Sequence, residues 1–245
     1  MRTPRILATS GGYVDGPVQQ CVRLGAMLLD ALTLTDKVRP RVCLLDTAGG
    51  DRDIRYAQAY EAFNHAGCDV SELRLFPQPS GDPEERLCAS DLVWVGGGSV
   101  ANLLVLWRLH GVDLAMRAAW ERGVILGGVS AGSVCWHVGG TTDSFGPTLR
   151  PVTNGLALVP YANGVHYDSE AQRRPLLHEL VQSNVLPPVA YATDDTVGIW
   201  YEGTEATTVV SDFDVDVRHG PGAYRVELVD GDVVETRFGV GENFD

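Results

Sequence analysis

Three runs of the sequence are apolar at almost every position, which is the pattern of strands covered on both faces. The runs are VCLLD, LVWVGG and GVILGG, which begin at Val42, Leu92 and Gly123. Segments with helical spacing of apolar residues lie between them, among them residues 54–67 and 100–111. Alternation of this kind predicts βαβ units and a parallel sheet with helices on both faces.

The pattern changes after about residue 182, where short alternating segments separated by turns predict strands and hairpins. No linker rich in proline or serine precedes this part, so we expect one α/β domain over residues 1–245, with antiparallel C-terminal hairpins. Near the N-terminus, the apolar spacing of residues 18–33 predicts a helix.

The charge balance argues against two classes of partner. The 245 residues carry a formal net charge of -13, which disfavours binding to nucleic acid and to anionic membranes. The N-terminal apolar run is too short for a signal-peptide core, and no window approaches the roughly 20 apolar residues of a membrane span. We therefore expect a cytoplasmic protein.

The cysteines and histidines do not form a metal-binding pattern. The five cysteines are odd in number, widely spaced and without a CxxC pair, and none of the six histidines forms a helical ligand pair. We expect no metal and no cofactor.

One serine lies in a context that suits a nucleophile. Residues 128–132, GVSAG, fit G-x-S-x-G between a predicted strand and a predicted helix. Ser130 could be a helix N-cap in an ordinary turn, or a nucleophile on a strained elbow whose neighbours must be small. Ser133 is the rival hydroxyl, but its place in the helix favours packing or a backbone hydrogen bond.

A serine nucleophile needs a base and an orienting acid. His166 follows a predicted short strand, and His219 lies in a loop. His137 lies about two turns after Ser130 in the same predicted helix, so its ring cannot fold back to the hydroxyl. The candidate acids are Asp195, Asp194 and Asp143. The order Ser130, Asp195, His219 matches α/β-hydrolases, whereas Ser130, His166, Asp195 implies another fold.

A glycine triplet after another strand supplies candidate oxyanion donors. The segment VGGGSVANLL, from Val95 to Leu104, lacks both the G-x-G-x-x-G spacing and the lysine of a P-loop. Its bare backbone allows close approach to a ligand, so the N–H groups of Gly98 and Ala131 could form an oxyanion hole.

Taken in order, GGGS, GGVSAGS, NGVHYD and TDDTVGIW resemble the serine peptidase family of peptidase E (aspartyl dipeptidase) and cyanophycinase over nearly the whole chain. The resemblance implies a flavodoxin-like sheet related to class I glutamine amidotransferases. It also implies Ser130 as nucleophile and His166 as base, with Asp195 as the acid and Asp194 in reserve. Asp143 matches another acidic position of the family.

The resemblance implies a serine exopeptidase that cleaves small peptides, with Asp-Xaa dipeptides as one candidate substrate. Where aspartyl dipeptidases carry an arginine after the histidine, this sequence has Glu170, and Arg173 or Arg174 are possible substitutes. Glu170 could instead bind a substrate amino terminus or a basic side chain. The alternatives are a cyanophycinase-like isopeptide hydrolase, a catalytically silent small-molecule-binding protein on the same fold, and an esterase. A homodimer is one candidate assembly.

Overall fold

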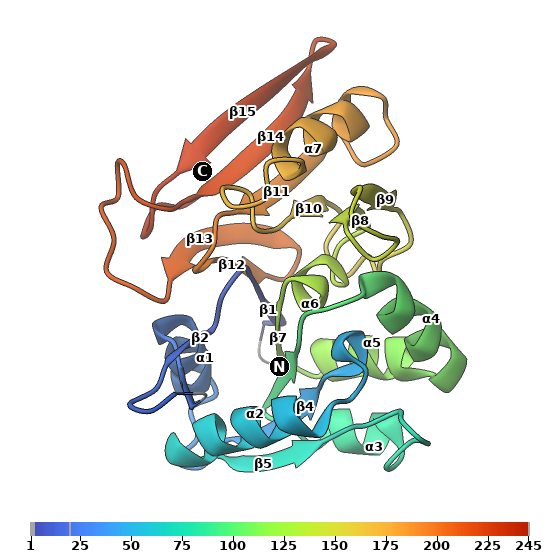
Figure 1. The fold of residues 1–245 in the computed structure, drawn as a ribbon, viewed down its shortest axis with the longest axis vertical. Coiled ribbons are helices and arrows are strands. Elements are labelled where there is room, and N and C mark those ends of the chain that lie inside the picture. Colours follow the sequence, from blue (N-terminus) through green and yellow to red (C-terminus); the bar gives the residue numbers. More distant parts are fainter. Residues whose placement is uncertain (1–2, 20, 245) are drawn as a thin grey trace.

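The computed structural model describes residues 3–19 and 21–244 and has a mixed α/β fold (Figure 1). Its strands form a seven-stranded sheet, a six-stranded sheet and a two-stranded hairpin. None of the described helices is both long and apolar enough to cross a bilayer.

The seven-stranded main sheet contains the three apolar runs predicted as buried strands. Its spatial order is β13-β12-β1-β7-β6-β4-β5, in which β1, β7, β6, β4 and β5 are parallel and the β12–β13 hairpin is antiparallel. The bounds are β1 Arg5–Thr9, β4 Arg41–Leu45, β5 Asp69–Glu72, β6 Leu92–Val95, β7 Ile125–Val129, β12 Val197–Glu202 and β13 Glu205–Ser211.

The order of the parallel strands differs from the flavodoxin order expected from the resemblance. Numbered along the chain, β5-β4-β6-β7-β1 reads 3-2-4-5-1, whereas flavodoxin has 2-1-3-4-5. The difference lies in the first strand, which pairs with β7 rather than with β4. The carboxyl ends of β1, β7 and β6 are therefore neighbours. The loop that follows the first parallel strand of the chain, β1, lies beside the loops that follow the last two, β6 and β7.

Alternating side chains of the main sheet pack into two apolar clusters, one on each face. Ile6 and Ala8 belong to one cluster and Leu7 to the other. On the Leu7 side lie α1 (Ala26–Leu34) and α2 (Asp53–His65), whereas α3 (Pro83–Cys88), α4 (Val100–His110) and α5 (Val112–Glu121) cover the other side. Helices on both faces agree with the prediction.

None of the described residues between 18 and Gly25 is helical, in contrast to the prediction for residues 18–33, of which residue 20 lies outside the described part. The segment contains β3 (Val22–Leu24), which pairs with β2 (Tyr13–Asp15), and the helix begins only at Ala26. Gly25 is extended at the N-cap and donates its N–H to Gly12 O at 2.8 Å. A Cβ on Gly25 would lie 2.0 Å from an oxygen of Asp212, so tertiary packing overrides the helical spacing.

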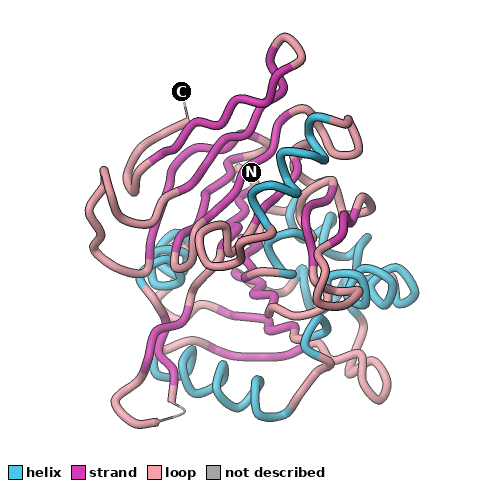
Figure 2. Tube along the Cα trace, turned by 45° about the horizontal axis from the view of Figure 1, so that its top comes forward, coloured by secondary structure: helices cyan, strands magenta, loops and turns pink. Residues whose placement is uncertain are grey.

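The C-terminal part forms two antiparallel hairpins, as the sequence predicts, and each of them joins a sheet. One hairpin, β12–β13, continues the main sheet, and the other completes the second sheet, whose order is β15-β14-β11-β10-β8-β9. Figure 2 shows the long β14–β15 hairpin beside α7 (Arg173–Gln182), which packs on this sheet. The bounds are β8 Gly139–Thr142, β9 Arg150–Val152, β10 Ala162–Gly164, β11 Val189–Thr193, β14 Ala223–Val229 and β15 Asp232–Phe238.

His137 lies fully buried between the two sheets. Its Nδ1 is 2.9 Å from Ser133 O and its Nε2 is 3.1 Å from the Tyr201 hydroxyl. Burial lowers the pKa of His137 from 6.5 to about 4. The folded protein therefore keeps this ring neutral, which supports a structural histidine.

Because the folded pKa of His137 lies below the unfolded one, its contribution to stability is complete above pH 6.5 and is lost as pH falls toward 4. We expect a loss of about 2 kcal/mol at pH 5 from this group alone. Urea unfolding of wild type and His137→Gln at pH 7 and pH 5 measures it. The variant should lose less stability between the two pH values, and equal losses would contradict the assignment.

Candidate active site

Ser130 occupies a strained turn between β7 and the short helix α6 (Ala131–Val134). Its φ is 57° and its ψ is -113°, a conformation that is rare for a residue with a side chain. A Cβ on Gly128 would lie 2.3 Å from Gly132 O, and one on Gly132 would lie 2.4 Å from Val95 O. Both flanking glycines are therefore required by close backbone packing.

The side chain of Ser130 argues against its interpretation as a helix cap. Ser130 stands at the N-cap position of α6, but its hydroxyl makes no capping hydrogen bond. The helix has only four residues, fewer than the sequence predicts. The rival Ser133 is fully buried and its hydroxyl donates to Asn163 Oδ1 at 2.9 Å. The Ser133 hydroxyl is thus already hydrogen-bonded, whereas the Ser130 hydroxyl does not cap the helix and is available for chemistry.

His166 and Asp195 lie in direct contact. His166 follows β10 with a φ of 53°, and its Nδ1 is 2.5 Å from Asp195 Oδ1. Its Nε2 has no hydrogen-bond partner within the part of the chain that the structure describes. A ring held at Nδ1 by a carboxylate, with Nε2 unoccupied, is the arrangement of a general base in a catalytic triad.

Two consecutive residues at the end of β1 hold all three loops of the site. Thr9 O accepts the N–H of Ser130 at 3.0 Å, and Ser10 Oγ accepts the N–H of His166 at 3.0 Å. Ser10 O also accepts the N–H of Thr196, the residue after Asp195, at 3.1 Å. Sequence reasoning missed Ser10. The available signal was the TSGG turn at the end of a parallel strand, where loops converge.

The two neighbouring aspartates face in different directions. Asp194 is buried, and its Oδ2 accepts the N–H of Gly222 at 2.9 Å and the Tyr224 hydroxyl at 3.0 Å. Burial raises the pKa of Asp194 above its ordinary range. Asp195 faces His166, and its N–H is held by Asp168 Oδ1 at 2.9 Å. Of these two candidate acids, only Asp195 contacts His166.

The rival base His219 lies in a different environment. Its side chain is 81% exposed, and Nδ1 is 3.1 Å from Asp216 Oδ2 in the loop before β14. Ser130, by contrast, shares a small internal space with Val165, the residue before His166. The geometry favours the order Ser130, His166, Asp195 over the α/β-hydrolase order.

Two backbone N–H groups beside Ser130 are unoccupied. Those of Gly98 and Ala131 make no hydrogen bond within the described residues. Gly98 has a φ of 140°, and a Cβ there would lie 2.2 Å from Ala48 O, so only glycine fits. A pair of free N–H groups at a nucleophile is what an oxyanion hole requires.

An acidic space adjoins Ser130 on the side of the second sheet. Asp143 lines both the small space at Ser130 and a cavity of about 320 Å³ that Glu170 also lines. Arg173 is 3% exposed, and it donates to Glu170 Oε2 at 2.8 Å and to Thr141 O at 2.6 Å. The charge of Arg173 is thus already paired.

Arg174, predicted as an alternative substrate-binding residue, is turned elsewhere. Its guanidinium pairs with Glu235 of β15 and lies 4.5 Å from the ring centroids of Tyr167 and Tyr224. Arg174 therefore packs the C-terminal hairpin against α7 rather than serving the site. Among the described residues, no group of three or more histidine, cysteine, aspartate or glutamate side chains is arranged to hold a metal ion.

Comparisons with known proteins find a matching family and two similar proteins. The model of peptidase family S51 matches residues 6–209. The uncharacterized peptidase YgaJ of Bacillus subtilis strain 168 is 36% identical over 204 residues, 83% of this chain and 85% of that protein. Peptidase E of Streptomyces coelicolor is 29% identical over 168 residues, 65% of this chain and 68% of that protein.

Two solved structures share the fold. A peptidase from an acI-B1 actinobacterium superposes with a TM-score of 0.69 at 14% identity, covering 99% of this chain and 97% of its own. A Listeria monocytogenes EGD-e protein provisionally assigned as peptidase E gives a TM-score of 0.61 at 18% identity, covering 85% and 98%.

Replacing Ser10 with alanine should destabilise the site by direct loss of contacts. The His166 N–H would lose its acceptor in a half-buried position, which costs about 1–3 kcal/mol of unfolding free energy, and the bonds of the Ser10 hydroxyl to Thr193 would be lost as well. Ser183→Ala is the matched control, because that exposed hydroxyl bonds only carbonyls of its own helix and its loss should stay within about 0.5 kcal/mol. Equal urea midpoints for Ser10→Ala and wild type would contradict the proposed anchoring.

Proposed function

The chain belongs to peptidase family S51, a serine peptidase family, and from this premise we propose that it is a dipeptidase-type exopeptidase. In this proposal Ser130 is the nucleophile, His166 the base and Asp195 the acid that orients it. The contact of His166 Nδ1 with Asp195 Oδ1, together with the strained turn at Ser130, carries the proposal. The substrate is a short peptide, and Asp-Xaa dipeptides belong in its test panel.

The chemistry follows from the positions of the groups. His166 Nε2 removes the proton of the Ser130 hydroxyl as Oγ attacks the scissile carbonyl carbon. The N–H groups of Gly98 and Ala131 stabilise the resulting oxyanion, and such donors are worth about 10²–10³ in rate each in well-studied enzymes. Asp195 fixes the ring tautomer and stabilises the imidazolium.

The second half of the reaction uses the same residues. The imidazolium of His166 returns the proton to the leaving amine, the C–N bond breaks, and an ester between Ser130 and the acyl part remains. Water, deprotonated by His166, then attacks the ester carbonyl and releases the free acid and Ser130. No further reactant is needed.

The acidic cavity supports recognition of a free amino terminus. The carboxylate of Asp143 has no side-chain hydrogen bond or ion pair within the described residues, and Glu170 lines the same cavity. Since Arg173 is already paired with Glu170, an acidic side chain of the substrate would find less free positive charge there. We therefore propose that this side holds the ammonium group of the residue on the acyl side.

We also propose that the main sheet is a rearranged sheet of the class I glutamine amidotransferase type. If β4 is counted first and β1 last, the order β5-β4-β6-β7-β1 reads 2-1-3-4-5. This reading supports the flavodoxin-like kinship with the first strand moved to the end of the order.

The triad assignment predicts a sharp contrast between the two aspartates. Ser130→Ala and His166→Ala should each lower kcat/KM for dipeptides by about 10³-fold or more, and Asp195→Asn by about 10²–10⁴-fold. Asp194→Asn is the matched control, because its carboxylate faces Gly222 and Tyr224, and it should lower stability rather than turnover. Full hydrolysis by Ser130→Ala would refute the proposal.

Recognition of the amino terminus predicts that blocking it is costly. Wild type should cleave a free dipeptide about tenfold or more faster, in kcat/KM, than its N-acetyl form, since a charge-assisted contact contributes about 1.5–3 kcal/mol. Asp143→Asn should reduce this ratio while leaving the N-acetyl rate unchanged. If Asp143→Asn abolishes cleavage of both substrates alike, Asp143 acts in the triad instead.

A further inference from the structure

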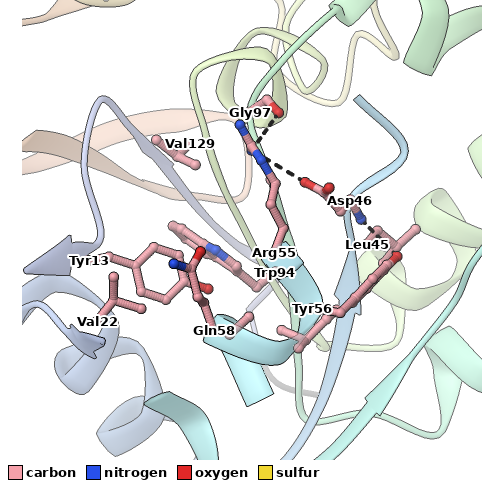
Figure 3. A pocket seen from close by; sticks show the side chains of 13 residues that line it. Tyr13, Val22, Leu45, Asp46, Arg55, Tyr56, Gln58, Trp94, Gly97 and Val129 are labelled. Carbon is pink, nitrogen blue, oxygen red and sulfur yellow. Dashed lines mark hydrogen bonds and ion pairs between the residues drawn. The ribbon is translucent and has the colours of Figure 1, made fainter. Parts of the chain in front are cut away.

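A second cavity adjoins Ser130 on the opposite side, and the mechanism above does not use it. It measures about 280 Å³ and lies between the carboxyl ends of β4, β6 and β7, helix α2 and the β2–β3 hairpin. Figure 3 shows Arg55 reaching from α2 into this region, toward Asp46 and Gly97. The volume is below the about 300–1,000 Å³ of pockets for drug-sized ligands, so it suits a single residue.

Arg55 is held at one edge of its guanidinium group. Its Nη1 donates to Gly97 O at 3.1 Å and is 3.4 Å from Asp46 Oδ1. Its Nε and Nη2 have no hydrogen-bond partner in the described part of the chain, and the side chain is 40% exposed. An anchored arginine with a free Nε–Nη2 edge presents two parallel N–H groups, which match a carboxylate.

Asp46 is built to position this arginine. It is 5% exposed and packs so closely that a Cβ on Gly49 or Gly96 would lie 2.4 Å or 2.6 Å from a carboxylate oxygen. Burial raises the pKa of Asp46, and the charges of Arg55 and Arg52 oppose the rise. The charge of the neighbouring Asp51 adds to this rise, so Arg55 and Arg52 lie beside two carboxylates.

The cavity lies next to the turn that carries the nucleophile. Gly97 and Val129 both line it, and a Cβ on Gly97 would lie 3.1 Å from Ser130 Cβ and 3.7 Å from its Oγ. The wall opposite is aromatic, because Tyr13 meets Trp94 edge-on with ring centroids 6.1 Å apart. When a substrate peptide bond lies at Ser130, the residue on one side of that bond can thus enter this cavity, among its apolar side chains and close to Arg55.

Each side of Ser130 offers one charged group that can still bind a ligand. On one side, the carboxylate of Asp143 makes no side-chain hydrogen bond or ion pair within the described residues. On the other side, Arg55 keeps its Nε–Nη2 edge free while its Nη1 pairs with Asp46. A dipeptide carries an ammonium group at one end and a carboxylate at the other, so this polarity orients it across the serine. We infer that the Arg55 cavity binds the leaving residue of the substrate, with Arg55 on its free carboxylate and Tyr13 and Trp94 beside its side chain.

This inference rests on the proposed peptidase function. Arg55 also has a second effect, on the proposed oxyanion hole, which the test must separate from binding of the carboxylate. Gly97 O and the N–H of Gly98 belong to the same peptide group, so the bond from Arg55 fixes the direction of a proposed oxyanion donor. Loss of Arg55 should slow every substrate through this peptide. Only loss of the carboxylate contact depends on whether the substrate has a free carboxyl end.

The test is a ratio of kcat/KM for a dipeptide over its C-terminal amide, measured with Asp-Leu and Ala-Leu and their amides. Wild type should favour the free acid by about 10- to 100-fold, as expected of a charge-assisted contact. In Arg55→Met the ratio should fall to about one, whatever the loss in overall rate. Arg55→Lys, which keeps the charge but not the fork, should give an intermediate ratio.

Arg122→Gln is the matched control, since this exposed arginine pairs with Glu84 and lines neither cavity, and its ratio should equal that of wild type. Equal cleavage of acid and amide by wild type, or an unchanged ratio in Arg55→Met, would overturn the carboxylate subsite alone. If Arg55→Met instead loses a preference for Asp-Leu over Ala-Leu, Arg55 reads the acyl side chain and the inference is wrong. No cleavage of any dipeptide by wild type would overturn the proposed function with it.

Discussion

Three hydrogen bonds at the carboxyl end of β1 determine where the candidate site forms. Thr9 O holds the Ser130 turn, Ser10 Oγ holds the backbone of His166, and Ser10 O holds the loop that carries Asp195. These loops come from residues more than a hundred positions away from β1 along the chain. Ser130 follows β7 of the main sheet, whereas His166 follows β10 of the second sheet, and Asp195 lies between β11 and β12. Residues from both sheets therefore meet at the end of β1.

Close backbone packing shapes the candidate site where these loops meet. The turn at Ser130 exists because Gly128 and Gly132 leave no room for a Cβ, and Gly98 approaches Ala48 O in the same way. Such contacts leave N–H groups unoccupied beside the hydroxyl, and one neighbouring cavity contains Asp143 while the other contains Arg55. We propose that the strained serine and the polarity around it are what make the chain a dipeptidase rather than a general peptidase.

Much of this arrangement was predictable, and the failures have physical causes. The doubly covered strands followed from their unbroken apolar runs, and the Ser130 turn followed from small residues at fixed spacing after a strand. The pairing of β3 with β2 was missed because it comes with a contact between distant segments, in which the Asp212 carboxylate packs against Gly25 and accepts the N–H of Met27. The strand order, the part played by Ser10 and the opposed directions of Asp194 and Asp195 depend on contacts between distant segments, which periodicity does not encode.

The central claim is that Ser130 is a nucleophile activated by His166, and covalent labelling tests it most directly. Intact-mass measurement after treatment with a fluorophosphonate, followed by peptide mapping, should find one adduct on Ser130. The labelling rate should fall by orders of magnitude in His166→Ala and not in His219→Ala. Labelling at Ser133 or another residue, or a Ser130 rate that is independent of His166, would contradict the account.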